Sequence, residues 1–310
     1  MATELGQAYV QIVPSAKGLS GAIKGQLDPE ADSAGKSAGS KIGTGIKLAA
    51  IAGVAAVGAT LGKIISSSLS EGADLQQSLG GIETLFKGSA DKVKGFANEA
   101  YKTAGLSANA YMENVTSFSA SLLQSVGGDT EKAADIGNMA MIDMSDNANK
   151  MGTSIGDIQH AYQGFAKQNY TMLDNLKLGY GGTKEEMQRL LTDAQKISGQ
   201  KYDMSNLADV YNAIHVVQGE LDITGTTAKE AASTFSGSFE SMKASLSNVL
   251  GKLSLGQDIG PSLQALAETT STFLFNNFIP MVGNILKALP GAITTFIADA
   301  APASWRVGNN

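Results

Sequence analysis

Apolar residues recur at intervals of three and four through residues 71–225, and this spacing limits the region to a helical fold. Residues three and four apart share one face of a helix, so each run marks a helix with one side to bury. The first run consists of Leu75, Leu79, Ile82 and Phe86. The period-two alternation of half-buried strands is absent here. We therefore predict a compact all-α domain over residues 71–225.

Residues that typically cap helix starts lie ahead of these runs. Ser, Thr and Asp side chains at such positions accept hydrogen bonds from the free backbone N–H groups of the first turn. The predicted caps are Ser107, Asp129, Ser154 and Thr183. Glu186 follows Thr183 at capping-box spacing, and Glu230 follows Thr227 in the same way.

The preceding segment, residues 1–70, has a different character. Residues 8–13 predict one short strand, which ends at Pro14. Glycines then recur every fourth residue from 35 to 43, and residues 48–62 carry no charge. Small-residue stripes let helices approach closely in lipid, although a membrane span needs about 20 apolar residues. Membrane insertion and a Gly/Ala helix packed against other copies in water are the two interpretations.

In residues 226–254 the apolar side chains recur with an average period closer to 3.5 than to 3.6 residues. The apolar positions are Phe235, Phe239, Met242, Leu246, Val249 and Leu253. A period of 3.5 is typical of a coiled-coil seam, but this run spans fewer than three heptads. A coiled coil and a single amphipathic helix docked on the helical domain both fit.

The last segment, residues 255–310, is apolar and almost free of charge. Residues 269–286 contain no ionisable side chain, and a second apolar stretch covers residues 288–297. Pro280 and several asparagines argue against a simple transmembrane helix. A broken hairpin that enters a membrane and a face that packs on a partner are the alternatives.

Composition excludes several classes of function. The net charge is −6, and residues 66–250 alone carry −8. Arg189 and Arg306 are the only arginines, which argues against sequence-specific nucleic-acid binding. The absence of cysteine excludes disulfides, thiol nucleophiles and cysteine zinc sites. The first residues lack the basic and apolar pattern of a secretory signal, so we expect none.

Two glycine motifs fail their structural requirements. Residues 35–39 match G-x-S-x-G, but a nucleophile elbow needs a preceding strand and a partnered histidine. Residues 179–182 open a helix at Thr183, a geometry that can hold a phosphate. That run lacks the third glycine of G-x-G-x-x-G, because Lys184 stands there. We predict a tight loop between helices.

The polar residues also form no convincing site. His160 and His215 have no second histidine at helical spacing, so both are predicted to be structural or solvent-facing. A cluster of calcium-type ligands comprises Asp143, Asp146, Asn147 and Asn149. The EF-hand spacing and its closing glutamate are missing. We predict no catalytic, cofactor-binding or metal site, and no enzyme.

Four segments resemble a known family. Residues 170–191, YTMLDNLKLGYGGTKEEMQRLL, resemble the signature stretch of tail tape-measure proteins of long-tailed phages and prophages. Residues 72–86, 118–125 and 140–148 resemble parts of the same N-terminal domain. Members of this family are usually far longer, so we expect an N-terminal fragment, a prophage remnant or a short form.

The resemblance implies a structural role. Copies of a tape-measure protein self-associate along the tail axis, and tail tube protein polymerises around them until the tape is covered. Tail assembly chaperones and baseplate or tail-tip proteins are the other implied partners. The implied locations are the host cytoplasm during assembly, the lumen of the virion tail, and the host membrane during genome ejection. The alternatives are a membrane-active, pore-forming helical protein and a prophage remnant without function.

Overall fold

The computed structural model describes the backbone of residues 54–284 and the side chains of residues 66–284. The chain divides into two units at Gly58, and every side chain considered below belongs to the second unit. The described residues are mostly helical and contain no strand, which confirms the all-α prediction. The predicted strand at 8–13, the glycine stripe at 35–43 and the apolar residues 285–310 lie outside the described residues.

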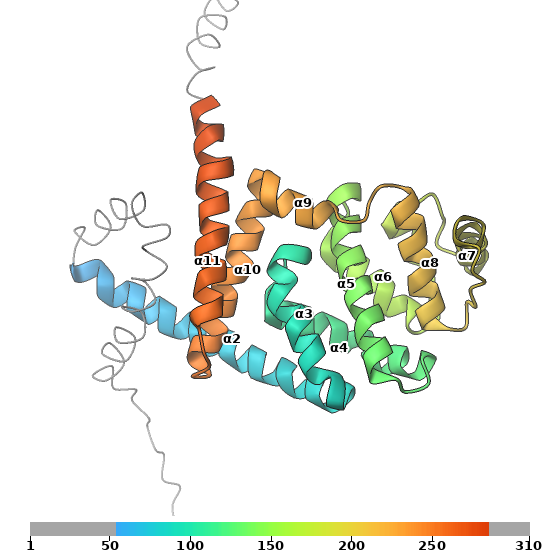
Figure 1. Cartoon of the computed structure of the whole chain (residues 1–310), viewed down its shortest axis with the longest axis horizontal. Coiled ribbons are helices and arrows are strands. Elements are labelled where there is room, and N and C mark those ends of the chain that lie inside the picture. The colour runs from blue at the N-terminus through green and yellow to red at the C-terminus, as the bar shows by residue number, and fades with distance from the viewer. Residues whose placement is uncertain (1–53, 285–310) are drawn as a thin grey trace, which may run out of the picture. The chain divides into compact units, whose positions relative to one another are not determined.

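The helices follow one another with short connections (Figure 1). The α-helices are α2 (Val54–Phe86), α3 (Ala90–Thr103), α4 (Ala108–Ser125), α5 (Thr130–Met151), α6 (Ile155–Phe165), α7 (Lys184–Ser198), α8 (Leu207–Glu220), α9 (Thr226–Ser233), α10 (Phe235–Ser254) and α11 (Gly260–Ser271). Two 3₁₀ turns, η1 (Lys87–Ser89) and η2 (Leu173–Leu176), and the π-helical η3 (Thr272–Phe278) complete the order.

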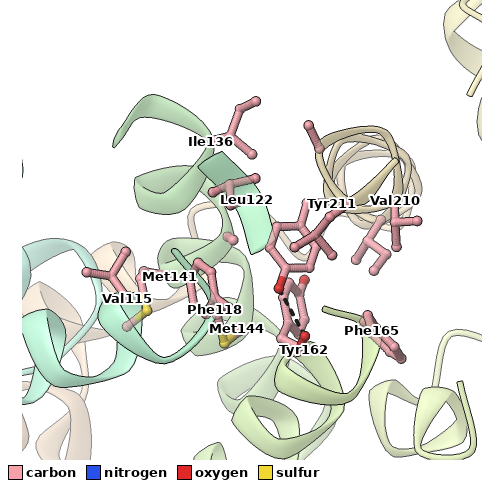
Figure 2. Close-up of a cluster of buried hydrophobic side chains, with 14 of the residues drawn as sticks. Val115, Phe118, Leu122, Ile136, Met141, Met144, Tyr162, Phe165, Val210 and Tyr211 are labelled. Atoms are coloured by element: carbon pink, nitrogen blue, oxygen red, sulfur yellow. Dashed lines mark hydrogen bonds between the residues drawn. The ribbon is translucent and has the colours of Figure 1, made fainter. Parts of the chain in front are cut away.

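Helix α5 is the central element, because it contacts α3, α4, α6, α8 and α9. Small residues on α5 bring its neighbours close: a Cβ on Gly137 would lie 3.0 Å from Val115 on α4. Large side chains fill the space between α4, α5, α6 and α8 (Figure 2). There Phe118 packs edge-on against Tyr211, with ring centroids 5.5 Å apart. The Tyr211 hydroxyl donates to the Tyr162 carbonyl oxygen at 2.9 Å.

Four predicted helix caps are confirmed and one predicted box is wrong. The side chains of Ser107, Asp129, Ser154 and Thr183 each accept a backbone N–H at the start of a helix. Thr227 was expected to begin a helix, but it lies inside α9, whose N-cap residue is Gly225. The side-chain acceptor for this helix comes from another helix, as described below.

Residues 226–254 form two helices separated at Thr234, whose hydroxyl accepts the Gly237 N–H at 3.1 Å. Helix α10 packs on α3, α4, α9 and α11 of the same chain. Of the apolar run, only Val249 is buried; the rest of the buried face consists of small and polar residues, including Ser238, Ser241 and Ser245.

Candidate functional site

The most unusual feature of the described residues is a buried polar junction of α5, α8 and α9. Asp143 and Asp146 lie one turn apart on α5 and are 1% and 0% exposed. The Asp143 carboxylate accepts from His215 on α8, with Nδ1 at 2.9 and 3.0 Å from its two oxygens. The His215 side chain is 40% exposed, so the pair reaches from the core to solvent.

Burial and charge perturb the protonation of this junction. Burial raises the pKa of Asp143 to about 6, although the hydrogen bond from His215 opposes this rise. The same hydrogen bond raises the pKa of His215 above its ordinary value, against the effect of its partial burial. Burial also raises the pKa of Tyr162 well above its usual range, and the nearby carboxylates of Asp143 and Asp146 add to that effect.

Asp146 performs a different task from Asp143. Its two carboxylate oxygens accept the Gly225 N–H at 2.6 Å and the Thr227 N–H at 2.7 Å. These donors belong to the start of α9, where free N–H groups and the helix dipole favour a negative charge. A side chain of α5 therefore caps α9 across about 80 residues of sequence, as the separations of 79 and 81 show.

The same junction contains unpaired buried polar atoms. Among the described residues, five buried side-chain oxygens have no hydrogen-bond partner, and four of them lie on α5, α8 and α9. These four belong to Ser145, Asn147, Gln218 and Thr227. Buried polar atoms are usually paired, so these four oxygens make the junction the least satisfied polar region among the described residues.

The structure separates the residues that suggested calcium. Asp143 binds His215 and Asp146 binds α9, while the Asn147 amide donates to the Leu176 carbonyl oxygen at 3.0 Å. Asn149 is exposed. The four side chains do not converge, and no group of metal-ligating side chains occurs in the described part of the chain.

The glycine run at 179–182 is closed by the chain's own carboxylate. Glu186 accepts the Gly181 N–H at 3.1 Å, in the place where a phosphate oxygen would bind. Arg189 donates to the Gly179 carbonyl oxygen at 2.7 Å and stacks on Tyr180, 4.4 Å from the ring centroid. The loop is thus held by internal contacts. The G-x-S-x-G match at 35–39 lies outside the described residues.

The two histidines differ sharply. His160 is exposed on α6, whereas His215 is fixed by Asp143. Within residues 66–284, His215 has no hydroxyl hydrogen-bond partner, so the pair can hold a proton but is not aligned with a nucleophile. The sequence signal for this pair was weak, because the partners are 72 residues apart and no motif joins them.

A second feature is an apolar surface, here called the phenylalanine face. It consists of the exposed rings of Phe235 and Phe239 on α10 and Phe278 on η3, with the Phe235 ring centroid 6.3 Å from that of Phe239 and 6.2 Å from that of Phe278. Phe273 connects α10 to η3, with its ring 5.2 Å from Phe235 and 5.3 Å from Phe239. No helix in residues 54–284 combines the length and apolar character that crossing a bilayer requires.

Comparison of the chain with protein-family models, with curated proteins and with solved structures finds no match.

Proposed function

We propose that this chain is a structural component of a phage-type tail, with the assembly role of a tape-measure protein. In this role it scaffolds the polymerisation of tail tube subunits, with chaperones and tail-tip proteins as further partners. It takes no part in catalysis.

One observation carries the proposal: the four segments with tape-measure resemblance belong to a single packed core. Residues 72–86, 118–125, 140–148 and 170–191 each contribute buried side chains to the same cluster. They include Phe86, Phe118, Met144 and Leu190, which are at most 2% exposed. A resemblance that extends over one domain requires such a shared core, and this agreement supports the proposal.

The phenylalanine face supports an assembly role. Phe235, Phe239 and Phe278 remain 37–40% exposed. Full burial of a phenylalanine is worth roughly 1.5–3 kcal/mol relative to full exposure, so covering the exposed part of each ring would add roughly 1 kcal/mol. Exposed apolar clusters of this kind mark interaction surfaces.

The test uses the phage or prophage that carries this gene. Removing the gene should abolish tails or leave tubes of irregular length, as seen by negative-stain electron microscopy. The wild-type gene supplied in trans should restore uniform tails, and the double variant Phe235→Ser/Phe239→Ser should not. The matched control is Ile197→Ser on α7, which alters another exposed apolar residue (45%) and should restore tails. Uniform tails without the gene would overturn the proposal.

Substitution is preferable here to deletion of residues 226–254. A free helix of that length would account for roughly 40 Å of tail at 1.5 Å per residue. Helix α10 packs on α3 and α4, however, so deletion would also uncover the domain core.

The phenylalanine face also favours one competing function, a membrane-active helical protein. The purified chain would then release dye from liposomes without any tail protein, and Phe235→Ser/Phe239→Ser would abolish the release. Tape-measure function predicts tail defects in the same variant and no leakage by the isolated chain.

A further inference from the structure

The polar junction brings together two carboxylates, one histidine and one tyrosine whose charges influence one another. Asp143 and Asp146 come from α5, His215 comes from α8 and Tyr162 comes from α6. Helix α9 contributes only the backbone N–H groups that Asp146 accepts. The charged groups that act on Asp143 are His215 and Asp146, so His215 supplies the positive charge at the junction.

Loss of the His215 proton changes this balance. A neutral imidazole can still donate from Nδ1, but it no longer compensates the charge of two buried carboxylates. Repulsion between like charges is strong where water is excluded. The resulting free energy is relieved most easily at Asp146, whose partners are the N–H groups of a short, separate helix. Helix α9 has eight residues and no side-chain cap from its own N-cap residue.

We propose that Asp143, Asp146 and His215 form a proton-operated latch, which seats the start of α9 on α5 when His215 is protonated and frees it when His215 is neutral. The latch is closed at a pH low enough to protonate His215 and opens as the pH rises and His215 loses its proton.

Helix α10 follows α9 directly, with only Thr234 between them. Helix α10 meets the domain through small polar residues, and the hydroxyls of Ser238 and Ser245 donate to carbonyl oxygens of their own segment, at Thr234 and Ser241. Other contacts hold α10 to the domain independently of α9: Asn248 accepts the buried Ala108 N–H at 2.7 Å, and Ser247 donates to Glu71. The pH response is therefore expected at the α9 end of this segment, next to Asp146.

Hydrogen exchange read by mass spectrometry measures the opening of the latch. Peptides that cover residues 223–233 report the Gly225 and Thr227 amides, and peptides within α7 serve as the internal reference. Opening of α9 should increase by about threefold or more between pH 6 and pH 8, after correction for intrinsic exchange. Helix α7 should show no such increase.

Three variants separate the latch from a merely structural contact. His215→Gln keeps a hydrogen-bond donor without the charge and should leave α9 open at both pH values. Asp143→Asn removes one carboxylate and should keep α9 closed at both. His160→Gln changes the other histidine of the chain, which is exposed, and should retain the wild-type pH response.

The histidine signals provide a second measurement that needs no variant. Their NMR titration should show that the His215 transition coincides with the pH at which α9 opens. Equal protection of α9 at pH 6 and pH 8 would overturn the proposal. A pH response that persists in Asp143→Asn, in a variant whose circular dichroism shows native helicity, would do so as well.

Discussion

Replacing Asp146 by alanine is the sharpest test of how α9 is held. The substitution removes the acceptor of two backbone N–H groups at 2.6 and 2.7 Å. Thr227 is buried, so its N–H loses its partner without access to water, at about 1–3 kcal/mol. Gly225 is exposed, so its N–H can be hydrated and costs about 0.5–1.5 kcal/mol. The free energy of unfolding should therefore fall by about 2–4 kcal/mol.

The assay is urea denaturation followed by circular dichroism at 222 nm, with thermal melts as a second readout. For a domain of this size, each kcal/mol corresponds to about 2–4 °C in Tm. Asp146→Asn keeps one acceptor oxygen and should cost about half as much as the alanine variant. The control is Asp135→Ala on the same helix, which removes an exposed ion pair with Lys92 and should cost less than about 1 kcal/mol.

The reasoning would be refuted if Asp146→Ala and Asp135→Ala had equal effects on the free energy of unfolding. That result would mean that the α9 amides find other acceptors at no cost. It would also remove the structural basis for coupling between α5 and α9.

Further predictions concern pH and the loops. The free energy of unfolding should rise as pH falls from about 8 to about 5, because folding raises the pKa of His215 and raises that of Asp143 to about 6. Denaturation at several pH values checks this. Asp143→Asn should flatten the whole dependence, because the hydrogen bond with Asp143 is the main cause of the raised His215 pKa. Gly182→Ala should cost about 1–3 kcal/mol in thermal melts, since its Cβ would lie 2.2 Å from the Thr171 carbonyl oxygen. Gly88→Ala, which meets open space, should not destabilise. Thr183→Ala should cost about 1 kcal/mol through the lost cap of α7.

Local patterns predicted most of the helices because helix formation depends on neighbouring residues. Caps such as Ser107 and Asp129 act on N–H groups two or three residues away, and the same short range makes them readable in sequence. The buried faces of the helices could be predicted in the same way: Ile82 and Phe86 belong to the first apolar run, and both are 0% exposed. Ile197 continues the apolar spacing of Leu190 and Ala194 on α7 but is 45% exposed, because spacing does not define where a face ends.

The polar junction could not be predicted because its contacts join distant residues. Asp143 and Asp146 read as a local acidic cluster, and only the fold shows that each faces a different helix. The capping box expected at Thr227 was wrong for the same reason. Thr227 and Glu230 have the right spacing, but the carboxylate of Asp146 already occupies the start of α9.

In α10 the sequence identifies the apolar side of the helix correctly, but the serine side, and not the aromatic side, packs on the domain. The sequence identifies its apolar side, yet Phe239 is 37% exposed while Ser245 on the other side is fully buried. The serines pack inward because their hydroxyls bond within the segment and their small size lets α10 approach the domain. The aromatic side instead packs against Phe273 of η3.

This arrangement makes a prediction opposite to that of an ordinary amphipathic helix. Ser245→Leu should destabilise the domain by about 1–3 kcal/mol, because the added atoms have no room. Phe239→Ser should cost less than this, because its ring is already partly in water, but it should impair tail assembly. Urea denaturation of both variants, together with electron microscopy of complemented particles, separates the two faces. A larger loss of stability from Phe239→Ser than from Ser245→Leu would show that the aromatic side, and not the serine side, holds α10 to the domain.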